Sequence, residues 1–283
     1  MEVSVVDDGL EIIVNGVYGS DVPTDPERNT AGIVSQLVME KMTDSTGLRL
    51  VLNKGVKPGY GLGSSGASAA AAALALNDLF HLDLSWRELI RLASQGEVAS
   101  AGVPHADNVS PALLGGFTIV RSYHPLDVIR IKPPQNLGVA VGIPRSSMTP
   151  NKTWLARSIL PQHVSMRQMV HEVGNASALV AGLMSGDIAL VGRSMNDLVV
   201  EPVRAKLIPG YRSVKQRAER AGAAGVAISG AGPAMLAIGD KSLVNMDAVA
   251  EAMEEGFAEA GVCADSYISS PGRAARLLGA NDH

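Results

Sequence analysis

The order of apolar and polar positions along the chain predicts short strands and helices in alternation. Residues 3–6 and 10–14 read as two strands, and Asp7-Asp8-Gly9 between them predicts a tight hairpin. A third strand is predicted to end near residue 52. Helices are predicted at 29–42, before that strand, and from the glycine-rich stretch after it to about residue 80. Another is predicted at 83–93, where Ser85 and Glu88 predict a capping box.

The second half of the chain has the same mixed character. Strands are predicted at 116–122, 128–132 and 137–143, and three helical stretches between residues 150 and 221. A strand, a turn and a strand occupy 225–238, a helix 246–260 and a last strand 263–269. We therefore expect an α+β protein of two lobes, divided at the Pro-Pro-Gln of 133–135 into 1–135 and 136–283.

Composition narrows the class of protein. The 283 residues are enough to bury a large core, and no run approaches the roughly 18 apolar residues of a membrane span. The start of the chain has no signal-peptide pattern, and the single cysteine, Cys263, excludes a disulfide framework. Scattered basic residues and a net charge of −4 argue against nucleic acid as a partner. We expect a cytoplasmic protein that binds neither nucleic acid nor membrane.

The stretch PGYGLGSSGASA at 58–69 lies between the third strand and the next helix. Its G-x-G-x-x-G at 61–66 lacks the second strand and acidic residue of a dinucleotide site, and no Gly-Lys-Ser/Thr follows for a Walker loop. Several glycines let backbone N–H groups converge at the start of a helix, where the helix dipole favours an anion. An ordinary turn needs only one or two glycines, so the stretch predicts a phosphate cradle.

The same stretch resembles the phosphate loop of the GHMP kinases, the family that includes galactokinase, homoserine kinase, mevalonate kinase and phosphomevalonate kinase. The family pattern is P-x-G-x-G-L-G-S-S-A-A, and Gly66 replaces its first alanine. ISGAGPA at 228–234 resembles a second family motif, a glycine turn that packs against the phosphate loop and the substrate. The resemblance implies a ribosomal protein S5-like N-terminal lobe and a ferredoxin-like C-terminal lobe.

Within this family the chain resembles the homoserine kinases from residue 3 onward. GVPHADNVSPALLGGF at 102–117 is similar to their G-x-x-H-x-D-N-V-x-P segment, and VEPVRAKLIPG at 200–210 to their E-P-x-R-x-x-L-I-P segment. The resemblance implies ATP-dependent phosphorylation of L-homoserine to O-phospho-L-homoserine, on the route to threonine. Two alternatives stay open: a kinase of the same family acting on shikimate, mevalonate or pantoate, and a catalytically impaired nucleotide-binding homologue.

The beginning of the chain departs from the family pattern. Homoserine kinases usually start with a further strand and a segment like A-x-x-x-N-L-G-P-G-F-D, which carries an Asn and an Asp that contact the substrate. Here the strand that usually follows comes first. We expect an uncovered sheet edge, near-normal binding of ATP and Mg²⁺, and poor turnover of homoserine. Without an evident carboxylate base, direct loss of the hydroxyl proton in a loose transition state is expected.

The expected ATP site combines the loop amides with Mg²⁺, which prefers hard oxygen ligands. The resemblance implies that Ser65 and Glu97 are those ligands and that Asn29 contacts adenine. Glu97 as a solvated surface residue and Asn29 as a helix N-cap remain alternatives. The residues expected to bind ATP are Asn29, Pro58, Gly59, Gly61, Leu62, Gly63, Ser64, Ser65, Gly66, Ala67 and Ser68.

The expected substrate site contains two arginines, because guanidinium groups bind carboxylates with two parallel hydrogen bonds. The resemblance places Arg157 and Arg204 at the substrate carboxylate, and Thr153 precedes Arg157 by one helical turn. For the two arginines, the alternative is a surface ion pair. For His105, the alternative is a structural role. A homodimer is a further expectation from the family. The residues expected to bind substrate are His105, Asn108, Thr153, Arg157, Arg204, Gly230 and Gly232, and those expected to act in catalysis are Ser65, Glu97, Arg157 and Arg204.

Overall fold

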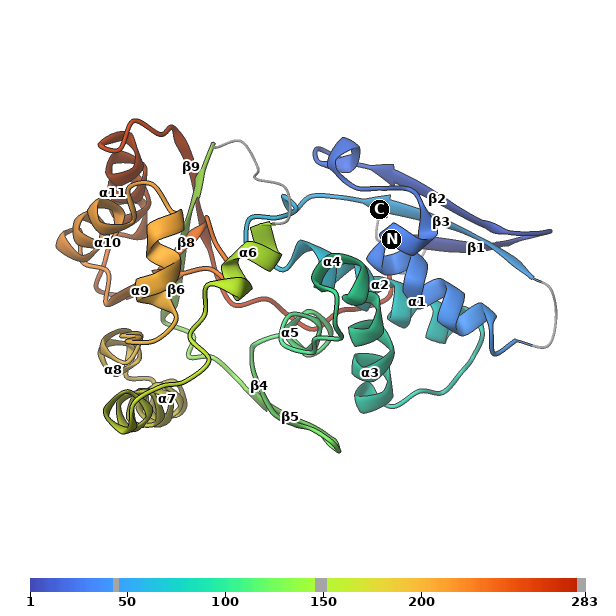
Figure 1. Cartoon of the computed structure of the whole chain (residues 1–283), viewed down its shortest axis with the longest axis horizontal. Helices are drawn as coiled ribbons and strands as arrows, with labels where there is room; N and C mark the ends of the chain where they lie inside the picture. Colours follow the sequence, from blue (N-terminus) through green and yellow to red (C-terminus); the bar gives the residue numbers. More distant parts are fainter. Residues whose placement is uncertain (43–45, 146–151, 279–283) are drawn as a thin grey trace. The chain divides into compact units, whose positions relative to one another are not determined.

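The computed structural model describes residues 1–42, 46–145 and 152–278, which form two compact units (Figure 1). The first unit contains Met1–Pro58, Gly63–Arg130 and the end of the chain from Gly272. The second contains Gly59–Leu62 and Ile131–Pro271. Two segments therefore depart from a single cut at residue 135: the tip of the glycine loop packs with the second unit, and the chain's end packs with the first. The predicted boundary stays a prediction.

The first unit is built on a three-stranded sheet of β1 (Glu2–Val6), β2 (Leu10–Asn15) and β3 (Gly47–Asn53), in the order β1-β3-β2. β3 pairs antiparallel with β1 and parallel with β2. The predicted hairpin of the first two strands is therefore wrong. β3 lies at the centre of the sheet, and its Leu48, Leu50 and Leu52 are buried. The helix α1 (Thr30–Met39) provides the crossover that the parallel pair of β2 and β3 requires.

Helices packed against one another complete the core of the first unit. The capping box of Ser85 and Glu88 is confirmed at the start of α3. α2 packs against both α1 and α3 (Figure 1). Buried alanines along α2 allow this close approach. The remaining elements are η1 (Gly19–Asp21), η2 (Pro26–Arg28), α1 (Thr30–Met39), α2 (Ser64–Leu79), α3 (Trp86–Gly96), α4 (Val98–Ala101), α5 (Val109–Leu114), β4 (Phe117–Tyr123) and β5 (Leu126–Ile131), the last two forming a separate sheet.

The second unit contains a four-stranded antiparallel sheet in the order β7-β8-β6-β9. Its strands are β6 (Leu137–Pro144), β7 (Gly225–Ile228), β8 (Met235–Asp240) and β9 (Ala264–Ser269). Two helices, α10 (Tyr211–Arg220) and α11 (Met246–Ala258), pack on this sheet (Figure 1). The side chains of Met235, Met253 and Phe257 are buried in the core between these elements.

The three helical stretches predicted between residues 150 and 221 are wrong in number, because glycines and caps divide them. Gly186, with φ of 77°, ends α7, and Asp187 caps the next helix. The described part of this region holds α6 (Lys152–Ser158), α7 (Met166–Ser185), α8 (Ile188–Arg193), α9 (Glu201–Arg204), η3 (Ala205–Leu207) and α10.

The α+β class is confirmed. In the described ranges, every helix is too short or too polar to cross a bilayer.

Candidate active site

The glycine loop leads from β3 into an uncapped helix. Gly63 is the N-cap residue of α2, with φ of 70° in the left-handed region that favours glycine, and no side chain caps this end. The first amides of a helix have no partner within it, and the helix dipole adds partial positive charge there. This arrangement of backbone groups suits a phosphate.

The tip of the loop packs on the second glycine turn. Gly61 has φ of 79°, and a Cβ there would lie 1.9 Å from the Ser229 carbonyl oxygen. The Ser229 hydroxyl donates to the Gly61 carbonyl at 2.8 Å, and the Ala234 amide donates to the Tyr60 carbonyl at 3.2 Å. The predicted packing of the turn against the loop is confirmed. Only glycine fits at position 61, because backbone occupies the space of a side chain.

The three loop serines have different roles. The Ser64 hydroxyl donates to the Val56 carbonyl at 2.7 Å, and the Ser68 hydroxyl donates to the Ser64 carbonyl at 3.3 Å; both residues are buried. Ser65 instead directs its hydroxyl to Glu97, with 3.2 Å between Oγ and Oε2. Two serines thus shape the loop, and the third forms a pair with a carboxylate.

Glu97 lies at the end of α3 and is only 3% exposed, so the alternative of a solvated surface residue is wrong. Its carboxylate is held beside Ser65 in the first turn of α2. A hydroxyl and a carboxylate are hard oxygen donors, which Mg²⁺ accepts together with water and phosphate oxygens. The pair therefore offers the kind of oxygen donors that a magnesium ion takes. Among the described residues no cluster of three His, Cys, Asp or Glu side chains offers another metal site.

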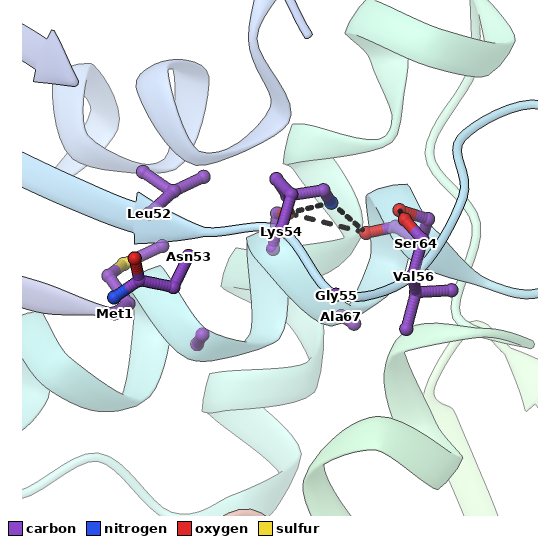
Figure 2. Close-up of a pocket in the computed structure, with 10 residues that line it drawn as sticks. Met1, Leu52, Asn53, Lys54, Gly55, Val56, Ser64 and Ala67 are labelled. Carbon is purple, nitrogen blue, oxygen red and sulfur yellow. Dashed lines mark hydrogen bonds between the residues drawn. The ribbon is translucent and has the colours of Figure 1, made fainter. Parts of the chain in front are cut away.

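Lys54, which sequence reasoning missed, lies beneath the loop. Figure 2 shows it reaching from the end of β3 to α2, where Nζ donates to the Ser64 carbonyl at 2.8 Å and to the Ser68 hydroxyl at 2.7 Å. It lines a pocket of about 110 Å³ together with Met1, Leu52 and Ala67. Burial lowers the pKa of Lys54 below its usual value, and the Glu97 charge opposes this shift. A lone lysine after a strand gave no distinctive signal in the sequence.

We expect Lys54→Met to weaken ATP binding about tenfold, equivalent to ~1.4 kcal/mol. Met keeps the volume of the side chain but removes the ammonium, so the Ser64 carbonyl loses a donor and the loop loses a nearby positive charge. Titration calorimetry with ATP and Mg²⁺ gives the dissociation constant, and the exposed Lys41→Met is the matched control. Equal affinities for the two variants would exclude a role for Lys54 at the loop.

Asn29 is buried at the N-cap of α1. Its Oδ1 accepts from the amides of Ala31 and Gly32, and its Nδ2 donates to the Pro23 carbonyl at 2.7 Å. The capping alternative is confirmed. A contact with adenine stays a prediction, since both polar atoms already have partners in the protein.

Asn108 lies against the phosphate loop. A Cβ at Gly66 would come within 2.8 Å of the Asn108 Cβ, and one at Gly63 within 3.3 Å of Asn108 Oδ1. Gly66 thus replaces the family's alanine where α2 approaches this neighbour closely. His105 is half-buried three residues earlier, in the stretch before α5.

The predicted carboxylate clamp lies in the second unit. Arg204, at the end of α9, donates from Nε to the Ala156 carbonyl and from Nη1 to the Gly230 carbonyl, both at 3.1 Å. Burial first, and the Arg157 charge second, lower the pKa of Arg204. The backbone of Thr153 lies in α6 with Arg157, but its side chain is outside the described part.

Glu201 ties the segment that carries Arg204 to the glycine turn. It is 7% exposed, accepts from the Ile228 amide at 3.2 Å just before the turn, and pairs with Lys215 at 3.3 Å. Burial first, and Glu201 second, raise the pKa of Tyr211 beside this pair. The sequence showed this glutamate only as part of the E-P-x-R segment.

The remaining predicted residues lie in or beside the glycine loop at 58–69 and the glycine turn at 228–234. Leu62 packs with Tyr60, Ile143 and Ala234 in a small apolar cluster. Gly232, with φ of 75°, leaves room for the Ile208 side chain, because a Cβ there would lie 2.9 Å from Ile208 Cδ1. Pro58 and Gly59 form the turn that enters the loop.

Comparison with known proteins identifies the family. The model of the GHMP kinases N-terminal domain matches residues 29–116, and that of the GHMP kinases C-terminal domain matches 178–259. A homoserine kinase from Methanococcus maripaludis is 44% identical over 86% of this chain and 79% of its own length. The chain belongs to the homoserine kinases of the GHMP kinase family.

Further homoserine kinases agree with this assignment. One from Methanocella arvoryzae is 42% identical over 96% of this chain and 85% of its own length. The crystal structure of a homoserine kinase from Cytophaga hutchinsonii, 37% identical, superposes with a TM-score of 0.87 over 96% of this chain and 85% of that one. The fold described above is thus shared with a homoserine kinase of known structure.

Proposed function

We propose that this protein transfers the γ-phosphoryl group of ATP to the side-chain hydroxyl of L-homoserine and releases O-phospho-L-homoserine. The observation that carries the proposal is the Ser65–Glu97 pair at the uncapped start of α2, in a chain of the homoserine kinase family. Phosphoryl transfer needs positioning and neutralisation of charge more than covalent catalysis. The loop supplies both from backbone and side-chain groups.

On the ATP side, the amides at the start of α2 bind phosphate oxygens. Gly61 and Gly63 hold the loop in the required shape, while Ser64, Ser68 and Lys54 brace it from beneath. Ser65 and Glu97 would hold Mg²⁺, which neutralises the charge of the β- and γ-phosphates when bound. Binding of adenine by Asn29 is part of the same proposal, on the family resemblance alone.

On the substrate side, Arg157 and Arg204 bind the carboxylate, with Thr153 on the same helix as Arg157. Because Nε and one hydrogen of Nη1 of Arg204 already bond Ala156 and Gly230, its contact with the substrate is made through Nη2 and the second hydrogen of Nη1. His105 and Asn108 orient the amino acid, and Gly230 and Gly232 leave room for it. The substrate hydroxyl loses its proton directly in a loose transition state. We place this reaction in threonine biosynthesis in the cytoplasm.

Turnover with a panel of alcohols tests the proposal. The purified protein with ATP and Mg²⁺ is offered L-homoserine, R-mevalonate, shikimate and pantoate, and the phosphorylated product is identified by ³¹P NMR. We expect kcat/KM for L-homoserine to exceed the others by roughly 10⁴-fold, as for sites that pair the polar groups of their substrate. A preference for another alcohol would assign a different substrate, and ATP binding without turnover would favour a catalytically impaired homologue.

A further inference from the structure

Gly66, in the first turn of α2, departs from the family pattern, which has alanine at this position. Glycine stabilises a helix less than alanine does, because it loses more backbone freedom on folding. A glycine inside the first helical turn therefore points to a neighbour that leaves no room for a methyl group.

That neighbour is Asn108, at the start of α5. A Cβ at Gly66 would lie 2.8 Å from the Asn108 Cβ and 3.2 Å from its carbonyl carbon. Two non-bonded carbon atoms pack best at about 3.5–4.0 Å, so alanine would push the two helices apart by roughly 1 Å. Glycine at position 66 thus sets how closely Asn108 approaches the glycine loop.

The glycine loop is held more firmly than the start of α5. Lys54 Nζ donates to the Ser64 carbonyl at 2.8 Å. The Thr30 hydroxyl donates to the Ser65 carbonyl at 3.1 Å. By contrast, α5 has only six residues, and no side chain caps its start. A methyl group added to Gly66 would therefore displace Asn108 rather than the loop.

The side chain of Asn108 is exposed beside the loop. Its backbone amide donates to Asp107 Oδ1 at 3.0 Å, and its carbonyl accepts from the Ala112 amide at 3.3 Å. Its side chain makes no hydrogen bond to another residue that the structure describes. A Cβ at Gly63 would lie 3.3 Å from Asn108 Oδ1, so this amide group lies against the N-cap of α2, where a phosphate is expected.

We propose that Gly66 is a positioning residue, which lets Asn108 reach an acceptor alcohol at the phosphate loop and so adapts the site to a short acceptor. This role rests on the proposed function, in which Asn108 orients the amino acid. Phosphoryl transfer needs the attacking oxygen in line with the phosphate, and a misplacement of 1 Å costs on the order of 100-fold in rate. Alanine at position 66 would keep the phosphate cradle, since the family pattern carries it, but would move Asn108 out of reach.

Gly66→Ala tests this role, with Gly174→Ala as the matched control, because a Cβ at Gly174 of α7 would meet nothing within 4 Å. We expect kcat for L-homoserine to fall about 10- to 100-fold in Gly66→Ala and to stay unchanged in the control. The dissociation constant of ATP, measured by calorimetry, should stay within about twofold in both variants. Equal kcat values in the two variants would overturn the proposal.

A double-mutant cycle shows whether Gly66 acts through Asn108. Asn108→Ala removes the amide and should itself lower kcat. Adding Gly66→Ala should then lower kcat little further, because the group that it misplaces is already gone. Losses that multiply in the double variant would mean that Gly66 acts through another residue.

A longer acceptor separates positioning from a general loss of activity. In 5-hydroxy-L-norvaline one more methylene separates the hydroxyl from the amino-acid group. The ratio of kcat/KM for L-homoserine to kcat/KM for this homologue should fall about tenfold in Gly66→Ala, because a longer chain tolerates a more distant Asn108. An unchanged ratio would exclude a role for Gly66 in the choice of acceptor length.

Thermal melting tests the contact without any turnover. Gly174→Ala should raise the melting temperature, as alanine does in helices, and Gly66→Ala should raise it less or lower it. In an Asn108→Gly background, which lacks the opposing Cβ, Gly66→Ala should be more favourable. Equal shifts in the two backgrounds would overturn the proposal. If the wild-type protein turns over another alcohol, the proposed function is wrong, and the kinetic comparison made with that alcohol still tests Gly66.

Discussion

Gly63→Val is expected to weaken ATP binding at least about 100-fold, or ~2.7 kcal/mol, while the protein still folds. Gly63 has φ of 70°, a conformation that β-branched residues avoid, and it is the N-cap of α2. Valine would force the backbone out of this conformation and turn the amides of the first helical turn away from a common point. A Cβ at this position would also lie 3.3 Å from Asn108 Oδ1, so the neighbouring side chain would be displaced.

Gly261→Val separates backbone strain from the loss of the site. Gly261 has φ of 73°, and nothing lies within 4 Å of an added Cβ. Both variants should therefore lose a similar free energy of unfolding, about 1–3 kcal/mol for a strained residue. ATP affinity measured by calorimetry, together with thermal melting, distinguishes them. Normal ATP binding by a folded Gly63→Val protein would show that this loop is not the phosphate cradle.

Arg204→Lys should raise the KM for L-homoserine about ten- to hundredfold, the roughly 1.5–3 kcal/mol of a charged two-point contact. Lysine keeps the charge but has a single donor centre. It cannot bond Ala156 and Gly230 as Nε and Nη1 do and also present two parallel donors to a carboxylate. Steady-state kinetics with each substrate varied in turn measures the effect.

The ATP KM should change by no more than about twofold in Arg204→Lys, because the proposal places Arg204 at the amino-acid carboxylate and not at the nucleotide. Arg212→Lys, at an exposed position of α10, is the matched control for a change of arginine to lysine. If both KM values rose equally, Arg204 would belong to the nucleotide site or to the support of the glycine turn, through its bond to Gly230.

Short-range patterns predicted the elements whose structure depends on neighbouring residues. The capping box at Ser85 and the strand-turn-strand at 225–238 follow from residue types a few positions apart. The hairpin of the first two strands failed for the opposite reason. Its turn residues were suitable, but β3, the most buried strand of this three-stranded sheet, lies between the first two strands and pairs with both.

The sequence alone determined the glycine loop, the glycine turn and the kinase family, because glycines that must adopt positive φ or make close backbone contact are visible as residue types. The resemblance already named Ser65 and Glu97 together, but only the tertiary structure showed that their side chains meet across 32 residues of sequence, and that Ser229 meets Gly61 across 168. It also placed Lys54 beneath the loop and Asn108 against Gly66. Such contacts depend on how whole elements pack, and packing over long separations leaves no local pattern to read.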